Sequence, residues 1–144
     1  MTSREYFEGV ADAVRAIVGC RARVEALRAR DASLGSPTSG ERVSGGDGPR
    51  DPRDVTAERM DAERRARREL AQLEAAVAEG RRRCAQVRAR NPSHAQWGDV
   101  LELRYCGLLG VADIAARMCV GQTTVKRWLS VALDWCDHAM FDPA

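Results

Sequence analysis

Apolar residues recur at alternating spacings of three and four along residues 3–30. The series consists of Val10, Ala13, Ile17, Cys20, Val24 and Leu27, and Tyr6 extends it backward. Such heptad spacing places apolar side chains along one seam of a helix. No proline interrupts the segment. The pattern predicts a long amphipathic helix that packs against another helix.

A second series with the same spacing fills residues 54–90. Its members are Ala66, Leu70, Leu73, Val77, Cys84 and Val87, and Gly80 fills one seam position. Asn91-Pro92 ends the segment, because the residue before a proline is pushed out of the α region. Two seams of similar length on either side of a connection most simply pair as an antiparallel helical hairpin.

The connection, residues 33–52, has no apolar period and holds five Gly, three Pro and four Ser. This composition predicts an exposed, flexible linker. We therefore expect a first domain over residues 1–92, formed by the hairpin and its linker. Residues 93–144 would form a second domain.

Short apolar runs broken by glycine characterise residues 93–144. Ser93 and Gln96 have the spacing of a capping box and predict a helix start there. Gly107 and Gly110 then separate that helix from a short one over 111–118. A tight turn and a helix with a polar start follow, which is the pattern of a helix-turn-helix. The predicted fold is thus all-α, with an N-terminal antiparallel hairpin (a coiled coil) and a C-terminal helix-turn-helix domain.

The second helix of this pattern carries the candidate binding residues. Val125, Trp128, Leu129 and Ala132 are expected to face the core. In a helix-turn-helix, the outward residues at the start of the second helix reach base edges. Lys and Arg can donate to guanine and Gln to adenine, while Thr can contact the thymine methyl. The candidate DNA-binding residues are Gln122, Thr123, Thr124, Lys126, Arg127 and, from the first helix, Arg117.

The run RYCGLLGVADIAARMCVGQTTVKRWLSVAL resembles region 4 of bacterial sigma factors. The matching positions are Asp113-Ile114-Ala115, Met118, Thr124-Val125 and Ala132-Leu133. Two positions depart from that pattern, since Cys119 stands where a glycine is usual and Gly121 where a serine is usual. A cysteine would be costly there if the position requires a positive φ.

The layout of the whole chain is similar to that of small phage-encoded regulators described as late-gene transcription activators. They join an N-terminal helical hairpin with a Gly/Ser/Pro-rich break to a sigma-like C-terminal module. The resemblance implies a sequence-specific DNA-binding transcription regulator of phage or prophage type. Its partners would be double-stranded DNA, RNA polymerase and a second copy of the chain, bound through the hairpin.

Composition narrows the function classes further. Hydrophobic residues make up 44% of the 144 residues and aromatic residues only 5%, which favours long helices over a sheet-based core. The sequence shows neither a membrane span nor a signal peptide, so a cytoplasmic protein is expected. No HExxH, GxSxG, P-loop or GxGxxG motif occurs, and no pair of the five cysteines has CxxC spacing. We expect reduced thiols, no metal or cofactor, and no enzymatic activity.

Charge leaves the function open in two respects. The arginine runs at 64–68 and 81–83 are either a solvated helix face, balanced by glutamates three or four residues away, or a surface for phosphate contacts. Residues 93–144 hold four basic and six acidic residues, a net charge of −2, although DNA-binding domains of this size are mostly basic. Two alternatives therefore stay open: a small terminase-like recognition subunit for phage DNA packaging, and a helical adaptor that binds only protein.

Overall fold

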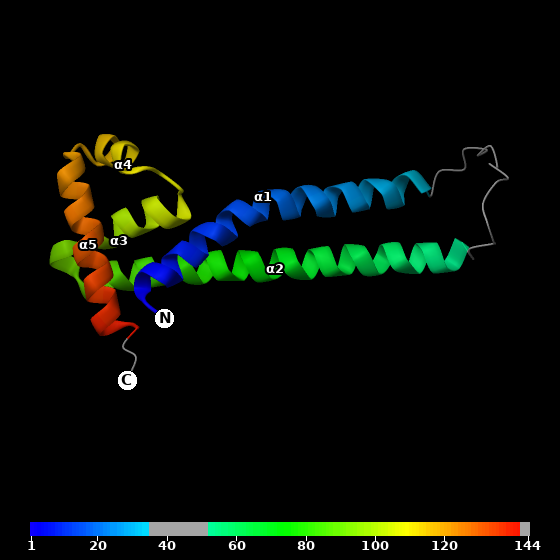
Figure 1. Ribbon diagram of the computed structural model, residues 1–144, viewed down its shortest axis with the longest axis horizontal. Coiled ribbons are helices and arrows are strands. Elements are labelled where there is room, and N and C mark those ends of the chain that lie inside the picture. The colour runs from blue at the N-terminus through cyan, green and yellow to red at the C-terminus, as the bar shows by residue number, and fades with distance from the viewer. Residues whose placement is uncertain (35–51, 142–144) are drawn as a thin grey trace. The chain divides into compact units, whose positions relative to one another are not determined.

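The computed structural model describes residues 1–34 and 52–141 (Figure 1). Its elements in chain order are α1 (Ser3–Leu34), α2 (Pro52–Arg90), the 3₁₀ turn η1 (Pro92–His94), α3 (Gln96–Leu101), the π-helical turn η2 (Glu102–Cys106), α4 (Val111–Met118) and α5 (Gln122–Ala139). No strand occurs in these two described ranges, so the predicted all-α class is confirmed. No helix among the described residues has the length and apolar character needed to cross a bilayer.

The described residues form two compact units. The first contains Met1–Ala16 and Leu73–Ala144, and the second contains Ile17–Gln72. The predicted domain boundary between residues 92 and 93 lies inside the first unit and stays a prediction. Helix α1 continues to residue 34, so the predicted connection begins later than expected, and its residues 35–51 lie outside the described part.

In the second unit, α1 and α2 run in opposite directions side by side (Figure 1). The seam positions Ile17, Cys20 and Val24 are buried on α1, and Ala66 is buried on α2. The thiol of Cys20 donates to the carbonyl oxygen of Ala66 at 3.4 Å. The periodicity of the sequence therefore identified the face of each helix that packs.

In the first unit, the N-terminal turns of α1 enter a core shared with α2, α3 and α5. The fully or almost fully buried residues of this core are Phe7, Cys84, Val87, Leu101, Ala132, Leu133 and Cys136. Phe7 is completely buried, whereas Tyr6, which the seam predicted, is half-buried. The prediction treated this part of α1 as one face of a two-helix seam. Phe7 instead faces a core to which several helices contribute.

Two sets of hydrogen bonds fix the start of α1. Thr2 and Glu5 form a capping box, in which the Glu5 N–H donates to Thr2 Oγ1 at 3.2 Å and the Thr2 N–H donates to Glu5 Oε2 at 2.9 Å. Ser3 is buried, and its N–H donates to Asp137 Oδ1 of α5 at 2.7 Å. Its hydroxyl donates to the Leu133 carbonyl oxygen at 2.9 Å. The first turn of α1 is thereby attached to the last turns of α5.

The substitution Asp137→Ala should lower the free energy of unfolding by about 1–2 kcal/mol, because it leaves the buried N–H of Ser3 without its charged acceptor. That N–H bond lowers the pKa of Asp137 below its ordinary value. The stabilisation is therefore present above the pKa of an unfolded aspartate, and is lost as the pH falls through the lower pKa of the folded state. Urea unfolding at a series of pH values measures both effects. Asp134→Ala, an exposed change on the same helix, is the control; an equal loss in both variants contradicts the prediction.

Residues 91–98 correct one detail of the sequence analysis. The predicted capping box of Ser93 and Gln96 does not form, because Pro92–His94 is a 3₁₀ turn and α3 starts after Ala95 with no side-chain cap. His94 instead stacks on Trp97, with ring centroids 4.5 Å apart. Helix α2 ends at Arg90, directly before Asn91-Pro92, as predicted, and the Asn91 side-chain amide donates to the Val87 carbonyl oxygen at 2.9 Å.

Candidate nucleic-acid interface

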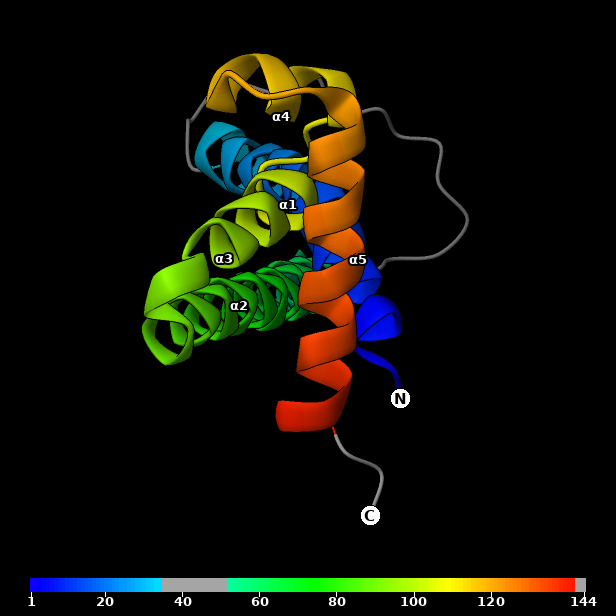
Figure 2. The ribbon, with the colours of Figure 1, turned by 90° about the vertical axis from the view of Figure 1, so that its left-hand side faces the viewer.

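Helices α4 and α5 pack together across a short turn (Figure 2). Gly110 is the N-cap of α4, with ψ of 164°. Ile114 and Ala115 of α4 and Val125 of α5 are buried in one cluster with Val100 of α3. The small side chain of Ala115 lies in this contact.

The turn between the two helices is a Schellman motif centred on Cys119. The Val120 N–H donates to the Ala115 carbonyl oxygen at 3.0 Å, and the Cys119 N–H donates to that of Ala116 at 3.4 Å. Cys119 has a φ of 58°, in the left-handed region that glycine usually occupies at this position. The cysteine that stands in place of the usual glycine of the sigma region 4 pattern thus has a positive φ.

Replacement of Cys119 by glycine should raise the free energy of unfolding by about 0.5–1 kcal/mol. A residue with a Cβ in the left-handed conformation costs about 1–2 kcal/mol, and glycine relieves this strain. The greater conformational freedom of glycine in the unfolded chain offsets part of the resulting stabilisation. Cys119→Ala keeps the Cβ and should leave stability nearly unchanged. Thermal unfolding of both variants measures their stability. If the alanine variant were stabilised as much as the glycine variant, backbone strain at Cys119 would not be the cause of the stabilisation.

The start of α5 presents polar side chains to solvent. Gln122, Thr123, Lys126 and Arg127 are exposed, and Thr124 is half-buried. The buried residues of α5 are Val125, Ala132, Leu133 and Cys136, and Trp128 and Leu129 are half-buried. The sequence therefore predicted the inward and outward faces of this helix correctly.

Arg117, the sixth candidate residue, is exposed in the last turn of α4, just before the Cys119 turn. Within the described part of the chain, Arg117, Lys126 and Arg127 make no ion pair or hydrogen bond through their side chains. Gly121 is the N-cap of α5 and supplies no side-chain acceptor. The first N–H groups of α5 and the positive end of its dipole therefore add to the positive charge of these three cations.

Positive charge on α5 is confined to its first two turns. Lys126 and Arg127 are followed on the exposed side by Ser130, Val131 and Asp134. The Asp134 backbone carbonyl accepts a hydrogen bond from His138, whose Nδ1 lies 2.8 Å away. An anionic ligand on this face would thus be attracted to the N-terminal part of α5 only.

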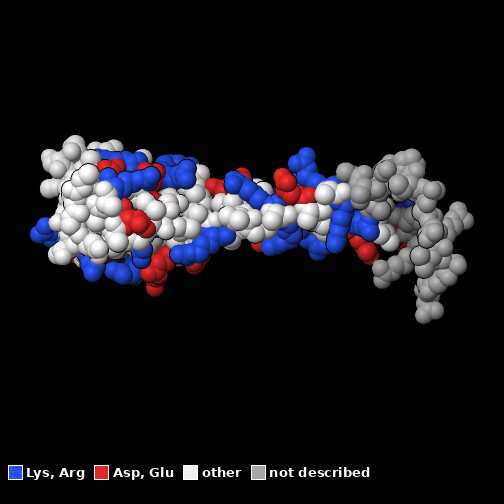
Figure 3. All heavy atoms as spheres, turned by 90° about the horizontal axis from the view of Figure 1, so that it is seen from above, with Lys and Arg blue, Asp and Glu red and all other residues white. Residues whose placement is uncertain are grey.

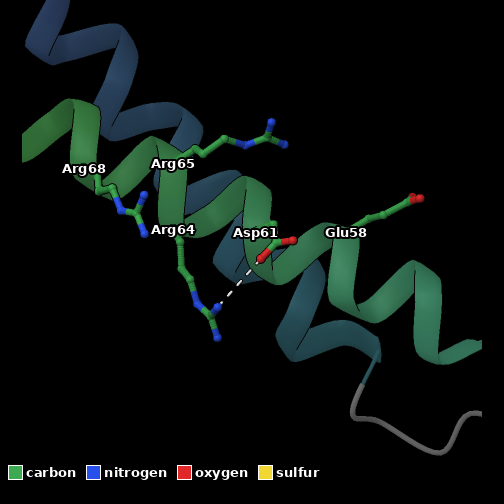
Figure 4. A pocket seen from close by; sticks show the side chains of 5 residues that line it. All are labelled: Glu58, Asp61, Arg64, Arg65 and Arg68. Atoms are coloured by element: carbon green, nitrogen blue, oxygen red, sulfur yellow. Dashed lines mark ion pairs between the residues drawn. The ribbon is translucent and has the colours of Figure 1, made fainter.

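The arginine runs of α2 are partly paired. Arg67 bonds to Glu63 at 2.7 Å, and Arg64 lies 3.7 Å from Asp61. Arg65 points away from Arg64 in the close view of Figure 4. On the face shown in Figure 3, basic and acidic side chains are intermixed. This part of α2 has the character of a solvated, charge-balanced face, with some arginines left over for further contacts.

No motif predicted a polar cleft of about 390 Å³ that lies in the first unit. Arg4, Glu8 and Asp12 of α1 line it together with Arg104 and Tyr105 of η2. These two segments are about a hundred residues apart in the chain, and neither contains a motif that relates it to the other. Phe7 of α1 stacks on Tyr105 of η2, with ring centroids 5.5 Å apart, which joins the two segments.

Comparison with known protein families, with curated proteins and with solved structures finds no match to this chain.

Proposed function

We propose that α4, the Cys119 turn and α5 form a helix-turn-helix that binds double-stranded DNA. The protein would be a sequence-specific transcription regulator of phage or prophage type. The observation that supports this most is the arrangement of α5. Its first two turns expose Gln122, Thr123, Lys126 and Arg127 without internal partners, while the opposite face is buried against α3 and α4.

Each exposed residue has a chemically suitable role in a major groove. Lys126 and Arg127 can donate to guanine, Gln122 can pair with adenine, and the Thr123 methyl can contact thymine. Arg117 lies beside the start of α5 and suits a phosphate contact that fixes the helix in the groove. Thr124 is half-buried and is better placed to support the turn than to read a base.

Selection of bound duplexes from a randomised DNA library by the full chain tests this function. We expect enrichment of one short motif at moderate salt, with retention that weakens as salt rises. If DNA is retained but no motif is enriched, and light scattering shows a ring-like assembly of the protein, the results support the alternative of a DNA-packaging recognition subunit. No retention even at low salt supports the adaptor and contradicts DNA binding.

A protein-binding adaptor is the second candidate, because the same region has features that suit a protein surface. Val131 is 39% exposed on α5, next to the acidic Asp134, and Leu108 is exposed to the same extent. Exposed apolar side chains among polar ones are common in surfaces that bind proteins. RNA polymerase is a partner with which both candidate functions are compatible.

Self-association through α1 and α2 is also part of the proposal. In the second unit, Val18 is 72% exposed on α1 and Met60 is 46% exposed on α2. Sedimentation of the full chain at micromolar concentration should show a species larger than the monomer, and Val18→Glu should weaken it. A monomer over the whole concentration range contradicts this part of the proposal.

A further inference from the structure

We propose that the polar cleft between the N-terminal part of α1 and η2 binds a small amino dicarboxylic acid, a ligand with two carboxylates and one ammonium group. The cleft has a volume of about 390 Å³ and lies within the first unit. Such a volume falls in the range of pockets that hold small molecules. The cleft is distinct from the exposed face of α5, and binding there does not depend on whether the protein binds DNA.

Two segments line the cleft. Arg4 and Glu8 lie one helical turn apart on α1 and therefore share one face of that helix. Arg104 and Tyr105 line the cleft from η2. The stacking of Phe7 on Tyr105 joins the two segments through the core, so the fold fixes the cleft.

Unpaired charges characterise the lining of this cleft. Arg4, Glu8 and Arg104 form no ion pair with any residue that the structure describes. Asp12 and Arg15, which also line the cleft, pair with each other at 3.0 Å. The cleft thus offers two guanidinium groups and one carboxylate to a ligand. An amino dicarboxylate carries the complementary set of charges, and guanidinium–carboxylate hydrogen bonds are among the strong ones in proteins.

The hydroxyl of Tyr105 lies among these three charges. Burial raises the pKa of Tyr105, the positive charges of Arg4 and Arg104 lower it, and the carboxylate of Glu8 raises it. The hydroxyl makes no hydrogen bond within the described part of the chain and is not sealed from solvent. It is therefore available to donate to a carboxylate held between the two arginines.

The loop after η2 forms a strained rim of the cleft. Leu108 has a φ of 56°, in the left-handed region that is unfavourable for a residue with a Cβ, and it is 39% exposed. Arg104 Nη1 donates to the Leu109 carbonyl oxygen at 3.2 Å, and the Leu109 N–H donates to the Leu103 carbonyl oxygen at 3.0 Å. Backbone strain of this kind is concentrated at functional sites. Here it holds an apolar side chain at the rim, where it can cover the methylene groups of the ligand.

Charge also distinguishes an amino dicarboxylate from other anions. A phosphate or a plain dicarboxylate can bind the two arginines, but it brings no cation for Glu8, and like charges at one site repel. An amino acid with a single carboxylate leaves one guanidinium group without its partner. Because a hydrogen bond to a charged group contributes about 1.5–3 kcal/mol, which is about 10-fold or more in affinity, loss of either charge should weaken binding at least about 10-fold.

Isothermal titration calorimetry of the full chain with L-aspartate and L-glutamate tests the proposal. We expect one or both to bind at least about 10-fold more tightly than the analogues that lack the ammonium group, succinate and glutarate. The same margin is expected over asparagine and glutamine, which lack one carboxylate. Equal affinity for an amino dicarboxylate and either kind of analogue would overturn the proposal, as would binding of inorganic phosphate alone or no binding of either amino dicarboxylate at millimolar concentration.

Glu8→Gln assigns the ammonium group to its partner. This variant should lose the preference for the amino dicarboxylate over succinate and glutarate, and should keep the preference over asparagine and glutamine. Glu25→Gln makes the same change at an exposed position of α1 outside the cleft and should behave as the wild type. Circular dichroism monitors the fold of both variants. A folded Glu8→Gln variant with the wild-type preference would contradict the proposed site.

Discussion

Replacing Gly98 by alanine is expected to lower the free energy of unfolding by about 2–3 kcal/mol, a value near the upper end for overpacked sites. Helix α3 crosses α2 at this glycine. A Cβ there would lie 2.4 Å from Arg88 Cγ and 2.6 Å from the Cys84 carbonyl oxygen. The Arg88 side chain can move, but the carbonyl belongs to the backbone of α2, so the two helices would have to separate.

Separation of the helices would also disturb the ion pairs at this crossing. Arg88 Nη1 lies 3.2 Å from Glu102 Oε2 of η2 and 3.4 Å from Asp99 Oδ1 of α3. The buried cluster of Val87, Leu101 and Cys84 lies beneath them. The loss should therefore appear as a reduced midpoint in urea with the helical circular dichroism of the folded state retained.

Gly9→Ala is the matched control for this variant. Gly9 is an exposed glycine within α1, and a Cβ placed there would meet nothing within 4 Å. Alanine should stabilise the helix at that position by up to about 1 kcal/mol. The two glycine-to-alanine changes are thus expected to have opposite signs. A gain in stability for both would contradict the described crossing of α3 and α2.

The double variant Lys126→Ala with Arg127→Ala is expected to lose specific DNA binding, with affinity for the selected duplex reduced by at least about 100-fold. One bidentate contact to guanine contributes about 1–3 kcal/mol to discrimination, so two contacts account for this loss. Both side chains are exposed and unpaired in the described structure, so their removal should leave the fold intact. Fluorescence anisotropy with the selected and a scrambled duplex measures the effect, and circular dichroism monitors the fold.

Arg65→Ala with Arg68→Ala removes the same charge from α2 and serves as the control. We expect it to retain the preference for the selected duplex. If these arginines contact phosphates, the affinity for both duplexes should fall by the same factor. The slope of the log binding constant against log salt concentration should then fall by about one unit for each lost contact. Loss of the preference in this control, but not in the α5 variant, would mean that α2 reads the DNA.

Helical periodicity predicted those parts of the fold that depend on one face of one helix. The spacing of Ile17, Cys20 and Val24 identified their burial, and the pattern around Val125 identified the exposed start of α5. Such spacing predicts the buried face of a helix directly, because the helix geometry places residues three and four positions apart on the same face.

Features that need two distant segments were not predictable in this way. The bond between Ser3 and Asp137 joins residues 134 positions apart, and neither residue differs in sequence from an ordinary helix-terminal polar residue. The π-helical turn and the burial of Phe7 likewise follow from how helices pack in the first unit. The failed capping box shows the converse, since the local signal of Ser93 and Gln96 was overridden by the turn that starts at Pro92.

The most direct test of the proposed function uses Cys119 as a position marker. It is the one exposed cysteine among the five, and it lies in the turn that precedes α5. A DNA-cleaving iron chelate attached to this thiol should cut the selected duplex at a few adjacent positions within the enriched motif, and should leave a scrambled duplex uncut. Tight binding of the selected duplex by the labelled protein without cleavage in or near the motif would contradict the placement of α5 in the groove.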